Sequence, residues 1–193
     1  MKNNKGFTLV EVLTVVLILS ILVAIAIPVY SNITQRAARN VLSYNSHSAY
    51  IFALLSIGDY DDDHLFSDNY NDTTTLAKFL EFELERLDTP NQSNDYNNKH
   101  NFENPYTKSR TILHYKSVSG VTSLYSGTVT QPAVFITNDT KCDPTNLNLS
   151  ESEEDSLAGT IVIYLRNNQL PVYIYALNKH GDLIEESLQK VYR

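Results

Sequence analysis

The sequence is poor in the residues from which several kinds of functional site are built. Its 193 residues include no tryptophan, one cysteine and six dispersed glycines. The single cysteine, Cys142, excludes an internal disulfide framework and a cysteine-based zinc cage. Basic residues are also few, with 15 Lys and Arg against 22 Asp and Glu, which gives a net charge of −7. This balance argues against a basic surface of the kind that coats nucleic acid, so we expect no direct nucleic-acid binding.

Familiar catalytic and metal-binding motifs are missing as well. The sequence contains no G-x-x-x-x-G-K-[ST], G-x-S-x-G, H-E-x-x-H or G-x-G-x-x-G. Cys142 has Lys141 beside it but lies in an otherwise acidic loop, and the five histidines lack close ligand spacing. The run Asp61–His64 lacks the glycine-containing spacing of a calcium loop, so a solvated loop is favoured over a calcium or zinc site. We therefore expect no enzymatic activity, no metal and no cofactor.

The N-terminal segment carries most of the information. Residues Phe7–Val29 form a run of 23 residues with one charge, Glu11. As a helix this run is about 34 Å long, enough to cross the hydrocarbon core of a bilayer. Lys2 and Lys5 precede it, so the positive-inside rule predicts a cytoplasmic N-terminus and export of everything after Val29. The sequence therefore predicts a single-span protein that faces outward.

Three interpretations compete for this run. A cleaved secretory signal is supported by Ala24-Ile25-Ala26, but Glu11 lies where an uninterrupted apolar region should begin. A plain membrane anchor leaves Glu11 unexplained, although an acidic residue inside a membrane span is costly and usually functional. The third interpretation accounts for the acid.

The residues Lys5-Gly6-Phe7-Thr8-Leu9-Val10-Glu11 resemble the cleavage motif of type IV pilins and pseudopilins. The resemblance implies that a prepilin peptidase cuts between Gly6 and Phe7 and N-methylates Phe7. It also implies that Glu11 meets the amine of a neighbouring subunit and sets its register during assembly. Pro28 lies where many members of the family have a helix-breaking proline, whereas Ser20 stands where many have a glycine.

The apolar helix is expected to continue well beyond the membrane. After Pro28 the pattern becomes amphipathic and predicts one helix over residues 7–57, bent or loosened near Pro28. We expect its apolar stripe to pack on a C-terminal sheet. The members of that stripe recur every three or four residues: Tyr30, Ile33, Ala37, Val41, Tyr44, Ser48, Ile51 and Leu55.

The rest of the chain predicts an α+β head. Residues 73–87 show helical periodicity, and Asn104-Pro105 is a turn signal. The tail from Asp182 is expected to form a short helix, with a last strand as the alternative. Five runs rich in Ile, Val, Tyr and Thr predict strands: 111–118, 121–125, 133–137, 160–166 and 171–177. A long helix packed on an antiparallel sheet is the pilin fold that the resemblance implies.

The expected organisation has four parts. They are a leader at 1–6, a transmembrane and assembly helix at 7–29, its amphipathic continuation at 30–57, and an exported head at 58–193. Many relatives close a C-terminal loop with a disulfide, which the lone Cys142 excludes here, so the sheet or hydrogen bonds must hold the loop at 141–156. The lone cysteine also fits the pilins of Gram-positive bacteria.

The resemblance implies a structural role in a surface filament. The expected function is a type IV pilus-like subunit for adhesion, twitching motility or aggregation, which resides in the membrane before assembly and in an extracellular pilus afterwards. Its expected partners are other pilin subunits of the same or another kind, the prepilin peptidase and the inner-membrane assembly platform. The alternatives are a pseudopilin of a type II secretion or competence DNA-uptake system, and a secreted or anchored binding protein.

Overall fold

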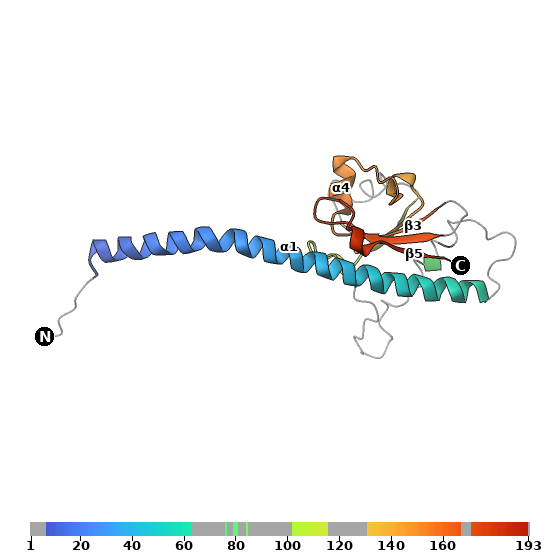
Figure 1. Ribbon diagram of the computed structural model, residues 1–193, viewed down its shortest axis with the longest axis horizontal. Helices are drawn as coiled ribbons and strands as arrows, with labels where there is room; N and C mark the ends of the chain where they lie inside the picture. Colours follow the sequence, from blue (N-terminus) through green and yellow to red (C-terminus); the bar gives the residue numbers. More distant parts are fainter. Residues whose placement is uncertain are drawn as a thin grey trace. The chain divides into compact units, whose positions relative to one another are not determined.

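The computed structural model describes residues 7–62, 76, 79, 80, 84, 102–115, 131–166 and 171–192. The chain divides into two compact units, Met1–Ala38 and Arg39–Arg193 (Figure 1). The described elements in chain order are α1 (Leu9–Asp62), β1 (Ile112–Tyr115), β2 (Val134–Thr137), η1 (Thr140–Cys142), α4 (Glu151–Leu157), β3 (Ile161–Leu165), β4 (Val172–Ala176), η2 (Glu185–Ser187) and β5 (Gln189–Val191).

The long helix predicted from the sequence is present as α1. It begins at Leu9 and runs to Asp62, five residues beyond the predicted end, so Asp61 and Asp62 are helical and not part of a loop. Asp63 and His64 lie outside the described residues. Pro28 lies inside the helix, which continues across it without a break. Proline has no amide hydrogen to donate. The carbonyl of Ala24, one turn earlier in the helix, therefore lacks its usual backbone hydrogen bond.

The head has the predicted α+β layout, but its sheet is mixed and not wholly antiparallel. The strand order is β1-β2-β3-β4-β5. β1 pairs with β2, and β2 with β3, in parallel, whereas β3–β4 and β4–β5 are antiparallel. Parallel neighbours need a long crossover, and the segment between β2 and β3 supplies one that contains η1 and α4. The antiparallel expectation was wrong for these two pairs because strand propensity does not specify direction.

Four of the five predicted strand runs correspond to β1, β2, β3 and β4. The run at 121–125 lies outside the described residues. The tail does not form the expected α-helix. It forms the single 3-10 turn η2 and then the short edge strand β5, with Ile174 opposite Gln189. β5 is therefore the last strand that was the alternative.

The face of α1 that packs on the sheet differs from the predicted one. The buried face carries Leu42, Ala49, Ala53 and Ile57. Ala49 and Ala53 share one core with Ile136, Ile163 and Ile174 of the sheet. The second half of α1 runs alongside the sheet (Figure 1). Small side chains allow the helix backbone to lie close to the sheet, and they provide the contact surface that large residues were expected to provide.

The large residues predicted to be buried are exposed instead. Tyr44 is 73% exposed, Ile51 45% and Leu55 64%. Both sets recur every three or four residues, so the periodicity correctly predicted a helix but not which face enters the core. The described residues of the second predicted helix (Leu76, Phe79, Leu80 and Leu84) are helical, and Leu80 and Leu84 are fully buried in the same core.

The opposite face of the sheet is covered by the connection between β2 and β3. Cys142 and Leu157 from this connection form a second core with Phe135, Val162 and Tyr175. The phenol of Tyr175 donates a hydrogen bond to the Cys142 carbonyl at 2.6 Å. The loop is thus held by the sheet and by hydrogen bonds, as expected for a chain without a disulfide.

Asn104 joins three segments of the head. Its backbone precedes the turn at 105–107, where the Asn-Pro signal predicted one. Its buried amide donates to the carbonyl of Ala158 at 2.8 Å and to that of Pro132 at 3.3 Å. Its side-chain oxygen accepts from the amide of Tyr106 at 3.0 Å. Gly159 lies against this side chain with φ +73°, a conformation and a close approach that both favour glycine.

Candidate functional site

The first turn of α1 contains a reciprocal pair of hydrogen bonds. The Thr8 amide and hydroxyl both donate to Glu11 Oε2 at 2.8 Å, and the Glu11 amide donates to Thr8 Oγ1 at 3.3 Å. Thr8 directly precedes the helix and Glu11 is its third residue, so the two form a capping box. The carboxylate also lies at the positive end of the helix dipole.

This arrangement adds Thr8 to the residues that the sequence analysis singled out. From the sequence Glu11 was expected to act in assembly only, and its local hydrogen-bonding partner was not predicted. The signal was present, because T-x-x-E before an apolar run is the sequence signature of a capping box. Oε2 accepts both bonds from Thr8, whereas Oε1 receives none from the described residues. One carboxylate oxygen is therefore open to a donor from outside the subunit.

Phe7 lies immediately before the capped turn, with 88% of its surface exposed. Gly6 lies outside the described residues, so the structure does not test the expected cleavage between Gly6 and Phe7. The N-methylation of Phe7 and the assembly role of Glu11 also stay predictions. The structure shows α1 unbroken at Pro28, so opening of the helix there in a filament stays a prediction as well. The described part of this region does bring Phe7, Thr8 and Glu11 together at one helix end.

The first half of α1 is an apolar surface with almost no charge. Its large side chains from Leu9 to Val29 are all at least half exposed, and Glu11 is its one charged residue before Arg36. By length and composition α1 is long and apolar enough to cross a membrane. The hydroxyls of Thr14 and Ser20 donate to carbonyls one turn earlier, at 2.8 and 2.7 Å. Neither of these two hydroxyls is therefore left as a free donor on the apolar surface.

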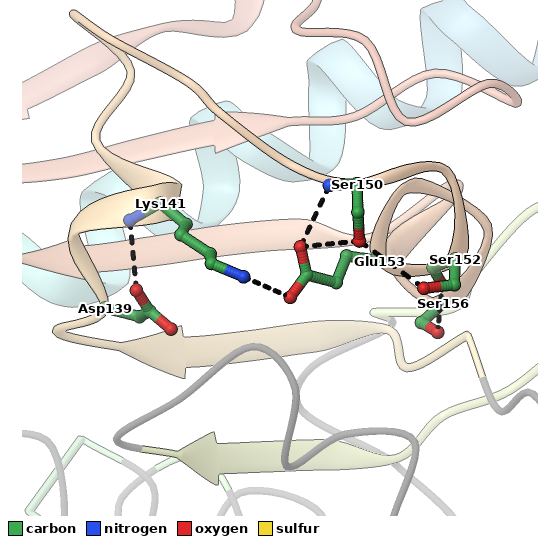
Figure 2. Close-up of polar contacts among 6 residues, drawn as sticks. All are labelled: Asp139, Lys141, Ser150, Ser152, Glu153 and Ser156. Carbon is green, nitrogen blue, oxygen red and sulfur yellow. Dashed lines mark hydrogen bonds and ion pairs between the residues drawn. The ribbon is translucent and has the colours of Figure 1, made fainter.

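A second polar cluster lies on the connection between β2 and β3 (Figure 2). Lys141 Nζ lies 2.6 Å from Glu153 Oε1. The Ser150 amide and hydroxyl both donate to Glu153 Oε2 at 2.9 Å. Glu153 is almost fully buried, and its hydrogen bond with Lys141 raises the pKa of that amine. The arrangement ties η1 to the start of α4 and is structural.

The cysteine next to this cluster is not activated for nucleophilic attack. Cys142 is fully buried, and burial raises the pKa of its thiol, so the nucleophilic thiolate is suppressed. No group of three or more metal-ligating side chains comes together within the described parts of the chain. The second cluster therefore holds the loop in place, and the start of α1 is the better candidate for function.

Comparison with known proteins also points to the N-terminal end of the chain as the candidate functional segment. A family model of the prokaryotic N-terminal methylation motif matches residues 1–27. This motif, followed by a long apolar helix, is typical of type IV pilins and pseudopilins. The N-terminal segment therefore resembles that of type IV pilins and pseudopilins, as the residues Lys5–Glu11 predicted. No curated protein and no solved structure matches the chain.

Proposed function

We propose that this protein is a structural subunit of a type IV pilus-like surface filament that serves adhesion, twitching motility or aggregation. The observation that carries the proposal is the N-terminal methylation motif over residues 1–27, which leads directly into the exposed apolar half of α1. In this account the prepilin peptidase cuts between Gly6 and Phe7 and methylates Phe7. The apolar half, residues 7–29, holds the subunit in the membrane until the assembly platform adds it to the filament. The head, residues 58–193, is exported.

Glu11 has two tasks in this proposal, one for each carboxylate oxygen. Oε2 caps its own helix through Thr8. Cleavage creates a basic amine at Phe7, and the amine of a neighbouring subunit donates to Oε1. Pairing the two charges offsets part of the cost of holding each of them in an apolar layer. The pair would set the register between subunits.

A pseudopilin of a type II secretion or competence system is the second candidate, because the same motif is typical of pseudopilins. The two candidates differ in where the assembled protein is found. A pilus subunit is recovered in long filaments when cells are sheared, whereas a pseudopilin stays with the cell envelope. Shearing followed by quantification of the protein in both fractions distinguishes them.

Three variants separate processing from assembly. Gly6→Leu should stay in the membrane with its leader attached. Glu11→Val should be cleaved normally yet fail to enter filaments, since it loses both the cap and the charge. Glu11→Gln is the matched control, because glutamine also serves at this position of a capping box but carries no charge. Normal filaments from Glu11→Gln would contradict the proposal that an amine–carboxylate pair sets the register between subunits. Capping of its own helix would then be the one remaining role of Glu11.

A further inference from the structure

The C-terminal segment of the head contacts the first turns of α1 that belong to the head. We call residues 183–191 the strap; they contain the 3-10 turn η2 and the edge strand β5. The hydroxyl of Ser46, which is fully buried, donates to the carbonyl of Ser187 in the strap at 2.7 Å. The strap therefore closes on residues 39–46 of α1 through a buried hydrogen bond.

Two further contacts join the strap to α1, one apolar and one charged. Leu42 packs with Ile184 in a small core. Arg39 Nη2 lies 3.0 Å from Glu186 Oε2, but the two side chains are 56% and 69% exposed. An ion pair as exposed as this one contributes little to stability, because water screens the two charges. Closure of the strap therefore depends mainly on the buried contacts of Leu42 and Ser46.

One buried polar side chain in this part of α1 opposes closure. Asn45 is 8% exposed, and its side-chain amide forms no hydrogen bond with the residues that the structure describes. It is three residues from Leu42 and next to Ser46, so it lies beside the two buried contacts with the strap. A buried amide without a partner gains hydrogen bonds when water reaches it. Opening of the strap is therefore favoured at this point of the helix.

The next turns of α1 are held by a different kind of contact. Ala49, Ala53 and Ile57 share the main apolar core with the sheet. Within the described sheet, β5 pairs with β4 over three residues, whereas β3 is paired along both edges. We infer that the strap opens and closes on residues 39–46 while the rest of the head stays folded. Opening adds these residues, about 12 Å of helix, to the part of α1 outside the head. The inference goes beyond the proposed function and does not depend on it.

Hydrogen exchange of the full-length chain in detergent micelles tests whether the strap opens by itself. The reporters are the amides of Ile184 and Ala176, which donate to the Ala176 carbonyl at 2.9 Å and to the Ser187 hydroxyl at 2.8 Å. The reference is the set of amides in β3, in the middle of the sheet. We expect the two reporters to exchange together and at least about tenfold faster than the reference. Exchange of the reporters at the rate of β3 would overturn the inference.

The variant Asn45→Leu tests the cause of opening. Leucine has a similar volume and no unsatisfied amide. It should therefore slow the exchange of both reporters by about tenfold and leave β3 unchanged. Asn40→Leu is the matched control, because Asn40 is exposed on the same helix and its replacement should leave the reporters as they are in the parent chain. Unchanged reporters in Asn45→Leu, or an equal change in Asn40→Leu, would also overturn the inference.

Ser46→Ala tests the buried hydrogen bond in the opposite direction, and it is informative even where Asn45→Leu does not fold. The Ser187 carbonyl loses this donor, so the reporters should exchange about fivefold faster or more. Ser48→Ala is the control, since the Ser48 hydroxyl donates within α1 to the Tyr44 carbonyl at 3.2 Å. Equal exchange in the two serine variants would contradict the strap. An uncleaved leader in the parent chain would instead contradict the proposed function and leave the strap intact.

Discussion

Replacing Asn104 with alanine should destabilise the head by an amount that its hydrogen bonds allow us to work out. Asn104 is fully buried. The Pro132 carbonyl keeps a second donor, the Thr160 hydroxyl at 2.9 Å, so it stays satisfied. The buried Ala158 carbonyl and the Tyr106 amide lose the side-chain partners they have at 2.8 and 3.0 Å. An orphaned buried group costs about 1–3 kcal/mol and a partly exposed one about 1 kcal/mol, which gives about 2–4 kcal/mol in total.

The assay is reversible thermal unfolding of the head followed by circular dichroism. For a unit of this size each kcal/mol lowers the melting temperature by about 2–4 °C, so Asn104→Ala should lower it by about 4–16 °C. Asn178→Ala is the matched control. Asn178 also accepts from two turn amides, at 2.7 and 3.1 Å, but these bonds are exposed, so its loss should cost less than about 1 kcal/mol.

A second variant tests the direction of the bonds. Asn104→Asp keeps the acceptor for the turn but places a carboxylate oxygen against the Ala158 carbonyl, where the parent side chain donates. It should therefore destabilise the head at least as much as alanine at neutral pH. Equal melting temperatures for Asn104→Ala and Asn178→Ala, or a parent-like value for Asn104→Asp, would refute the reasoning.

Three further outcomes are expected. Burial raises the pKa of Tyr175 well above its ordinary value. The stability that the buried phenol contributes is therefore complete below about pH 10 and declines as the pH rises further. Tyr175→Phe should reduce this alkaline loss of stability, measured by urea titrations at about pH 8 to 11. The same variant should lose about 1–3 kcal/mol at pH 7, because the Cys142 carbonyl loses its 2.6 Å donor, and a parent-like midpoint would contradict that bond. Thr8→Val removes the capping hydroxyl and should reduce filament yield while Thr8→Ser restores it; equal yields would show that the cap is dispensable.

Much of the fold could be predicted because its signals are local. The 54-residue helix follows from an apolar run joined to a stretch of 3.6-residue periodicity, and four strands follow from β-branched and aromatic runs. Which face of the helix enters the core could not be predicted. Ala49 and Ala53 recur with the same spacing as Tyr44 and Ile51, and hydrophobicity alone favours the larger pair. Close packing on a sheet favours the smaller pair, and that preference depends on tertiary structure.

The direction of the strands was equally beyond local reasoning. Whether β1, β2 and β3 run parallel depends on the path of the connections between them, which strand propensity does not report. At the candidate site, the composition pointed to Glu11 and the motif to Gly6 and Phe7. The hydrogen-bonding partner Thr8 was not predicted, although the capping-box spacing T-x-x-E is visible in the sequence.

The central claim is that the chain is processed and assembled as a pilin-like subunit, and the N-terminal mass of the native protein tests it most directly. Protein is sheared from the surface of cells, and its N-terminal peptide is identified by mass spectrometry. The account predicts a chain that starts at Phe7 and carries an N-methyl group. A chain that starts at Ile27, as cleavage after Ala26 by a signal peptidase would give, would contradict it, because such a chain would have lost Glu11 and most of the apolar half of α1.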